Sequence, residues 1–173
     1  EYLAITNSKR LVQAGAHAVK LEGGKEVSKI IKVVKNSGIP VMGHIGYTPQ
    51  FKKKFKIEGR TAFKAKELLR EAFLIQEAGA FSIVLECIDP SASKLITKTL
   101  SIPTIGIGAS SYCDGQILVT DDMLGVSGFY PKFVKKYANL NRIIEKAVKK
   151  YTRDVKIRKF PAINNFLDGT KTR

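Results

Sequence analysis

The chain has 173 residues with 44% apolar and 9% aromatic content, and its 30 Lys plus Arg against 15 Asp plus Glu give a formal net charge of +15. This composition predicts a single globular domain over residues 1–173, with a disordered tail at about 161–173, and excludes a fibrous or wholly unfolded chain. Because 23 of the basic residues are lysines spread over several expected helices, a solvated surface explains the charge better than nucleic-acid binding, which relies more on arginine.

Short apolar runs alternate with longer amphipathic stretches along the chain. The opening segment through Val12 is expected to be helical, and the first strand follows at 16–21. Further strands are expected at 39–44, 80–87 and 102–107, and further helices at 24–36, 61–78 and 91–100. This alternation predicts an α/β fold with parallel strands joined by right-handed crossovers.

The chain contains an internal repeat. AGAHAVKLE at 14–22 matches AGAFSIVLE at 78–86, and IPVMGHIG from Ile39 matches IPTIGIGA from Ile102. In each Ala-Gly-Ala, the glycine tolerates the positive φ that ends many helices, so a strand can begin directly afterwards. Such a repeat is typical of a (β/α)8 barrel, and a doubly wound open sheet is the alternative.

Charged side chains stand on two of the expected strands. Because side chains alternate along a strand, Lys20 and Glu22 share one face, and Glu86 ends the matching strand on the equivalent face. In (β/α)8 barrels, catalytic residues point inward at the carboxyl ends of strands. A single strand-end glutamate often pairs with a lysine or caps a helix, but two at homologous positions favour a functional role.

His44 lies near the end of the strand expected at 39–44. Its partner in the repeat is Ile107, so the fold itself does not require a histidine at this position. A lone histidine in a core is commonly structural, and its ability to exchange a proton near neutral pH also makes it a catalytic candidate.

Several motifs follow one another in order along the chain. They are VKLEGG at 19–24, GHIGYTPQ at 43–50, IVLEC at 83–87, IPTIGIGAS at 102–110 and PKFVKKYA at 131–138. Together they resemble the ketopantoate hydroxymethyltransferase family, also called 3-methyl-2-oxobutanoate hydroxymethyltransferases. The resemblance implies a (β/α)8 TIM barrel, of which this chain supplies only the later strands and helices.

The resemblance also implies a reaction. The family transfers a hydroxymethyl group from 5,10-methylenetetrahydrofolate to 3-methyl-2-oxobutanoate, which gives 2-dehydropantoate in pantothenate and coenzyme A biosynthesis, through a magnesium-stabilised enolate. By their match to the family motifs, Glu86 is expected to be the proton acceptor, Lys20 to bind the keto acid, Glu22 to bind Mg²⁺, and His44 to be a catalytic residue near the substrate. Oxygen ligands at a barrel mouth suit magnesium.

The chain also departs from the family pattern. The strands that carry two metal-binding aspartates and a serine in the family have no counterpart here, so we expect a fragment of a working enzyme that is incomplete in isolation. A truncated product without activity is the alternative. Asp89, Asp114, Asp121 and Asp122 match none of the missing ligands, and FKKKFK at 51–56 replaces a loop that usually contains a Gly-Gly pair.

The remaining expectations concern location and partners. No apolar run approaches the roughly 20 residues of a membrane-spanning helix, and Cys87 and Cys113 are too differently placed for a disulfide or metal site, so we expect a cytoplasmic protein. The family resemblance implies a homo-oligomer. Two alternative functions stay open, namely another magnesium-dependent α-keto acid lyase or transferase, and an inactive polyanion-binding fragment that uses FKKKFK.

Overall fold

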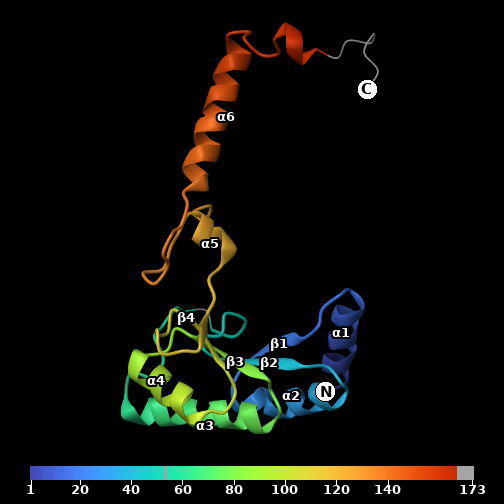
Figure 1. The fold of residues 1–173 in the computed structure, drawn as a ribbon, viewed down its shortest axis with the longest axis vertical. Coiled ribbons are helices and arrows are strands. Elements are labelled where there is room, and N and C mark those ends of the chain that lie inside the picture. The colour runs from blue at the N-terminus through green and yellow to red at the C-terminus, as the bar shows by residue number, and fades with distance from the viewer. Residues whose placement is uncertain (53, 167–173) are drawn as a thin grey trace. The chain divides into compact units, whose positions relative to one another are not determined.

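The computed structural model describes residues 1–52 and 54–166 (Figure 1). The chain divides into two compact units, residues 1–117 and 118–173, which are described separately below. This division concerns compactness and not independent folding, so the single domain expected over residues 1–173 stays a prediction.

The first unit alternates helices and strands. Its elements are α1 (Tyr2–Gln13), β1 (Val19–Glu22), α2 (Lys25–Asn36), β2 (Val41–Gly46), α3 (Ala62–Glu77), β3 (Ser82–Glu86), α4 (Pro90–Thr99), β4 (Thr104–Ile107) and β5 (Gly115–Gln116). The four strands and four helices expected in this part of the sequence are present, and their ends shift by only a few residues. The short strand β5 was not anticipated.

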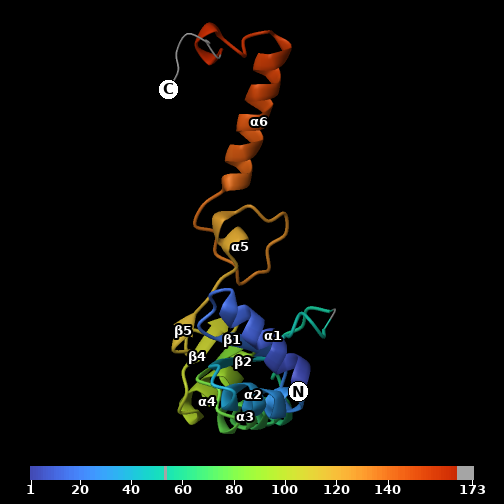
Figure 2. The same cartoon turned by 90° about the vertical axis from the view of Figure 1, so that its right-hand side faces the viewer.

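The five strands form one parallel sheet in the order β1-β2-β3-β4-β5. Figure 2 shows β4 and β5 next to each other at one edge of it. Each strand pairs with the next strand in sequence, which is the order of a (β/α)8 barrel. A doubly wound sheet instead reverses its strand order at a switch point, so that alternative is excluded for this unit. The sheet therefore fits the expected partial barrel.

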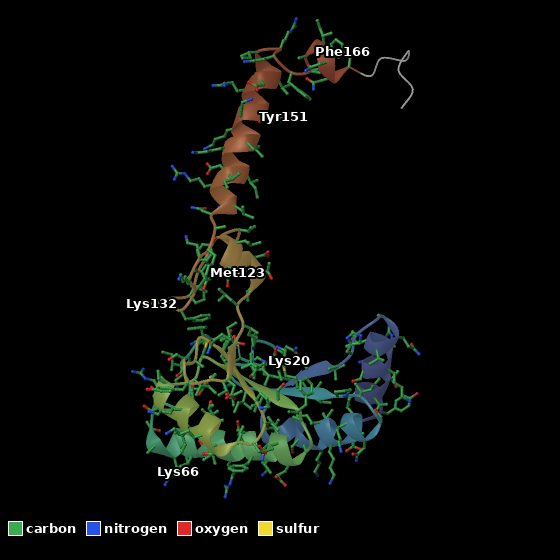
Figure 3. The ribbon with its side chains drawn as sticks, in the orientation of Figure 1. Lys20, Lys66, Met123, Lys132, Tyr151 and Phe166 are labelled. Carbon is green, nitrogen blue, oxygen red and sulfur yellow. The ribbon has the colours of Figure 1, made fainter. Side chains whose placement is uncertain are left out.

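The two faces of the sheet differ in what covers them. Helices α2, α3 and α4 lie along one face, where they bury an apolar core (Figure 1). The largest fully buried side chains of this core are Ile31, Val34, Val41, Ile45, Ile75, Ile83, Leu85, Ile88 and Ile96. Because side chains alternate along a strand, the other face carries Lys20, Glu22, His44 and Glu86. In Figure 3, Lys20 lies on this second face, whereas Lys66 points outward from α3.

Local sequence signals explain where the helices begin and end. The Thr61 hydroxyl accepts a hydrogen bond from the Lys64 N–H at the start of α3, and an Asp89 carboxylate oxygen accepts one from the Ser91 N–H at the start of α4. Gly15 and Gly79 follow α1 and α3 with φ of 105° and 91°. Both glycines of the repeated Ala-Gly-Ala therefore have the predicted positive φ.

The second unit contains two α-helices and a short 3-10 helix among the residues described. They are α5 (Thr120–Leu124), α6 (Leu140–Lys156) and η1 (Ile163–Asn165). Most of the tail expected to be disordered, residues 167–173, lies outside the described residues, so that expectation stays untested there. None of the helices in the described ranges is long and apolar enough to cross a membrane.

Candidate active site

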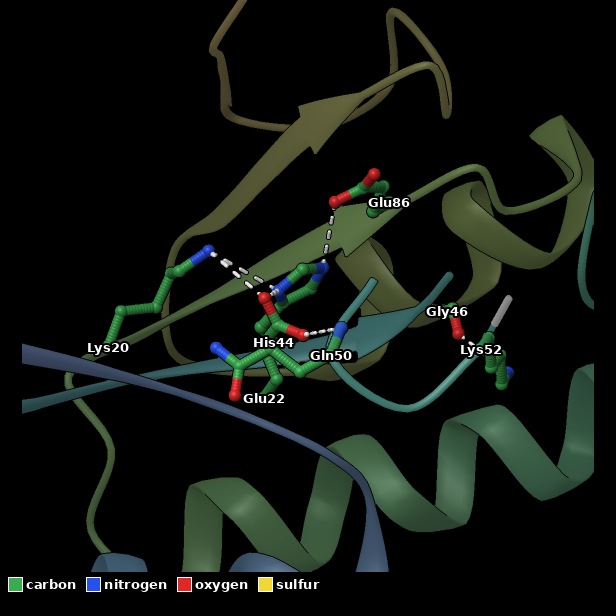
Figure 4. A network of polar contacts seen from close by, with 7 residues as sticks. All are labelled: Lys20, Glu22, His44, Gly46, Gln50, Lys52 and Glu86. Carbon is green, nitrogen blue, oxygen red and sulfur yellow. Dashed lines mark hydrogen bonds and ion pairs between the residues drawn. The ribbon is translucent and has the colours of Figure 1, made fainter. Parts of the chain in front are cut away.

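Three neighbouring strands bring the predicted site residues together. Glu22 ends β1, His44 lies in β2, and Glu86 ends β3. In the sheet register, Glu22 pairs with His44 and Glu86 pairs with Gly46, two residues beyond the histidine. The parallel register therefore places two carboxylates on either side of one imidazole (Figure 4).

His44 is the centre of this network. It is 0% exposed, its Nδ1 lies 3.6 Å from Glu22 Oε1, and its Nε2 lies 3.1 Å from Glu86 Oε2. The contact with Glu86 is short but does not have hydrogen-bond alignment, and the buried Nε2 has no other partner among the described residues.

Lys20 adds a positive charge to the same cluster. Its Nζ lies 3.4 Å from His44 Nδ1 and 3.9 Å from Glu22 Oε1, and its side chain is 43% exposed. An ammonium can only donate hydrogen bonds, so in this contact Nδ1 is the acceptor. The half-exposed ammonium is bound to the cluster on one side and can receive an anionic ligand on the other.

Glu22 is the one predicted metal ligand. Its side chain is 8% exposed, and its Oε2 accepts a hydrogen bond of 3.2 Å from the Gln50 backbone N–H. The part of the chain that the structure describes contains no group of three or more His, Cys, Asp or Glu side chains that could hold a metal ion. Magnesium is commonly held by one or two carboxylates with water and substrate oxygens completing the shell, so Glu22 fits as one ligand of such an ion.

Groups that follow β2 support the Glu22 carboxylate and the Glu86 backbone, and sequence reasoning missed them. The Gln50 N–H contacts Glu22, and the Tyr47 N–H donates to the Glu86 carbonyl oxygen at 2.8 Å. Lys52 donates from Nζ to the carbonyl oxygen of Gly46. Tyr47 and Gln50 lie inside the GHIGYTPQ motif, which could have drawn attention to them, whereas nothing in the sequence marks Lys52 apart from its neighbouring lysines.

Other acidic and thiol groups of the first unit have local roles or low reactivity. Asp114 accepts hydrogen bonds from the backbone and hydroxyl of Thr104, which supports leaving it out of the site. Cys87 and Cys113 are free and buried. Burial raises the pKa of the Cys87 thiol to about 12, with a smaller contribution from Glu86, and burial also raises the pKa of Cys113. Both thiols therefore stay protonated and weakly nucleophilic at neutral pH.

A cavity of about 390 Å³ opens beside the turns that follow β1 and β2. Its lining residues are Gly23, Gly24, Glu26, Val27, Ile45, Gly46, Thr48, Phe51, Lys52 and Glu71. The cavity includes core residues from the helix-covered face, and the four predicted site residues are not part of its lining. The candidate active site is therefore the cluster of the four side chains, and it does not coincide with this cavity.

Comparison with known proteins adds independent information. A model of the family "Ketopantoate hydroxymethyltransferase" matches residues 1–163. The chain is 53% identical over 165 residues to the 3-methyl-2-oxobutanoate hydroxymethyltransferase of Clostridium botulinum strain Langeland, which covers 92% of this chain and 60% of the relative. The proteins of the same name from Syntrophus aciditrophicus and Pelagibacter ubique are 52% and 48% identical, over 91% of this chain in both cases. The chain spans about 60% of the length of these relatives.

Proposed function

The chain belongs to the ketopantoate hydroxymethyltransferase family, and from this premise we propose that, as part of a complete (β/α)8 enzyme, it converts 3-methyl-2-oxobutanoate to 2-dehydropantoate with 5,10-methylenetetrahydrofolate as one-carbon donor. The observation that carries the proposal is the cluster at the carboxyl ends of β1, β2 and β3. There a histidine with no exposed surface lies between two glutamates, beside a lysine that is open to an anion.

The proposed roles follow from the position of each group. Glu86 is 17% exposed, so its carboxylate has lost much of its hydration while still being accessible, as a base that removes a proton from C3 of the keto acid must be. Lys20 offers its ammonium to the substrate carboxylate, where it also favours negative charge developing on the keto oxygen. His44 contacts the base directly and orients it.

Magnesium is proposed as the metal, with Glu22 as one of its ligands. When bound, it would supply Lewis-acid polarisation of the keto group. The Gln50 N–H orients the Glu22 carboxylate through Oε2 and leaves Oε1 directed toward His44 and Lys20. A metal-ligating carboxylate normally has such a supporting donor, because it fixes the direction of the remaining lone pairs.

Exchange of deuterium into C3 of 3-methyl-2-oxobutanoate tests the proposal, because it reports proton removal without the folate. The assay uses the restored protein, in which this chain is joined to the part of the Clostridium botulinum relative that precedes the matched region. We expect exchange in the presence of Mg²⁺ and its loss by at least about 100-fold in Glu86→Gln, since a general base contributes roughly 10²–10⁴-fold. A folded restored protein that forms no deuterated keto acid would refute the proposed function.

A further inference from the structure

Lys52 makes two side-chain hydrogen bonds that join separate parts of the site. Its Nζ donates to the Gly46 carbonyl oxygen and to Glu58 Oε1, both at 2.8 Å. Gly46 is the last residue of β2, and Glu58 lies in the segment that leads to α3. One ammonium therefore holds the two ends of the β2–α3 connection together, and Figure 4 shows its contact with Gly46.

Both acceptors of Lys52 lie next to the chain around Glu86. The Tyr47 N–H, directly after Gly46, donates to the Glu86 carbonyl oxygen at 2.8 Å. The Glu58 N–H donates to the Cys87 carbonyl oxygen at 2.9 Å, and the Glu58 carbonyl oxygen accepts from the Asp89 N–H at 2.8 Å. The residues that Lys52 holds are thus the ones that fix the backbone at and after the proposed base.

Lys52 also ends the turn that supports Glu22. The Phe51 and Lys52 N–H groups both donate to the Thr48 carbonyl oxygen, at 3.0 and 2.9 Å. This turn contains Gln50, whose N–H donates to Glu22 Oε2. If the Lys52 side chain is released, the turn loses its tie to β2 and to Glu58, and the donor to Glu22 is free to move.

We propose that Lys52 is a positioning residue for the reaction, in that its ammonium fixes the 48–52 turn so that Glu22 and Glu86 stay on either side of His44. The proposal rests on the proposed function for its catalytic consequence, although its structural part can be tested without activity. Exposed ion pairs contribute little to global stability, and the Lys52 and Glu58 side chains are both partly exposed. A merely structural surface pair would therefore leave both the Gln50 amide and the catalytic rate unchanged.

Lys54 provides the matched control. It belongs to the same loop, its replacement removes the same charge, and no hydrogen bond or ion pair of its side chain is found within residues 1–52 and 54–166. Lys52→Met and Lys54→Met thus have the same effect on net charge, but only Lys52→Met removes the hydrogen bonds to Gly46 and Glu58. Lys52→Arg keeps a cation with several donors and serves as the conservative variant.

The experiment measures two quantities in the restored protein, namely hydrogen exchange at the Gln50 amide by NMR, and kcat and KM for deuterium exchange at C3. In Lys52→Met we expect the Gln50 amide to exchange about tenfold faster, because local opening becomes easier. We also expect kcat to fall about tenfold with little change in KM, which is the pattern of lost transition-state alignment.

The control variants separate this role from a loss of charge. Lys54→Met should match the parent protein, and Lys52→Arg should recover part of the rate. If Lys52→Met is poorly folded, Glu58→Gln, which keeps an acceptor and loses the charge, is expected to show the same changes at a smaller size.

Each outcome has a separate meaning. Equal Gln50 exchange in Lys52→Met and Lys54→Met overturns the proposal, whatever the activity. Faster Gln50 exchange with an unchanged kcat shows that Lys52 only holds the loop, and it overturns the positioning role. If the folded parent protein shows no exchange at C3, the proposed function fails, and the amide measurement alone decides whether Lys52 fixes the turn.

Discussion

The two repeated halves of the first unit, residues 14–46 and 78–109, have the same backbone plan and different inward side chains. Both halves end their first strand with a glutamate, Glu22 or Glu86. The first half carries Lys20 and His44 where the second has Val84 and Ile107. Since the apolar pair supports the same strands, the lysine and the histidine are not needed for folding, and their presence is better explained by chemistry.

The turns after the two glutamates differ as well. Gly23 follows Glu22 with φ of 125°, and Cys87 follows Glu86 with φ of 53°, a conformation that costs free energy for a residue other than glycine. In the first half, a Cβ added to the next residue, Gly24, would lie 2.4 Å from the carboxyl carbon of Glu71. The absence of a side chain at Gly24 therefore lets the Glu71 carboxylate of α3 pack directly against the first turn.

The largest expected effect distinguishes the proposed role of Glu22 from that of Glu86. If Glu22 is a metal ligand and Glu86 a base, Glu22→Gln should raise the Mg²⁺ concentration for half-maximal exchange by about 100-fold, in line with the cost of disturbing a metal site. Glu86→Gln should instead lower kcat without changing the Mg²⁺ dependence. Magnesium titrations of both variants in the C3 exchange assay make this measurement. Identical Mg²⁺ profiles in the two variants would contradict the division of roles.

A second test removes one of the side-chain differences between the two halves. His44→Ile places the residue of the second half at the equivalent position of the first. Because His44 Nε2 is buried without an aligned partner, its removal offsets the loss of the Nδ1 contact with Lys20, and we expect the free energy of unfolding to change by less than about 1 kcal/mol, as measured by urea denaturation. Activity should fall about tenfold, since the imidazole that lies 3.1 Å from the proposed base no longer helps to position it. A loss of stability well above about 1 kcal/mol in His44→Ile would show that the histidine is structural after all.

The sequence predicted β1 to β4, α1 to α4 and the shared face of Lys20, Glu22 and Glu86, because these depend on local periodicity and on the repeat. It did not predict that His44 lies between the glutamates, because that depends on how adjacent strands are paired. The register that places Glu22 opposite His44 and Gly46 opposite Glu86 is set by packing of the whole sheet. The support from Gln50 and Lys52 was also missed, since backbone donors and loop contacts have no periodic signal.

The smallest expected effect concerns Glu71, the α3 carboxylate that lies against the first turn. Burial raises the pKa of Glu71 above its ordinary value of 4.5, with a further contribution from Glu26 and an opposing one from Lys52. The folded state therefore binds this proton more tightly than the unfolded state. The stabilisation from the protonated form is fully present below pH 4.5 and is lost as the pH rises through the folded pKa.

At neutral pH the ionised Glu71 carboxylate therefore opposes folding, and Glu71→Gln should be more stable than the parent protein. Because the group is only half-buried, solvent screening limits the gain to below about 1 kcal/mol. The gain should shrink toward zero as the pH falls below 4.5, where both proteins are neutral at this position. Urea denaturation at pH 7 and pH 4 measures it, with Glu67→Gln as control, because Glu67 is an exposed residue of the same helix that pairs with Lys64. A gain that persists unchanged at pH 4 would show that packing against Gly24, and not the charge of the carboxylate, distinguishes the first turn from the second.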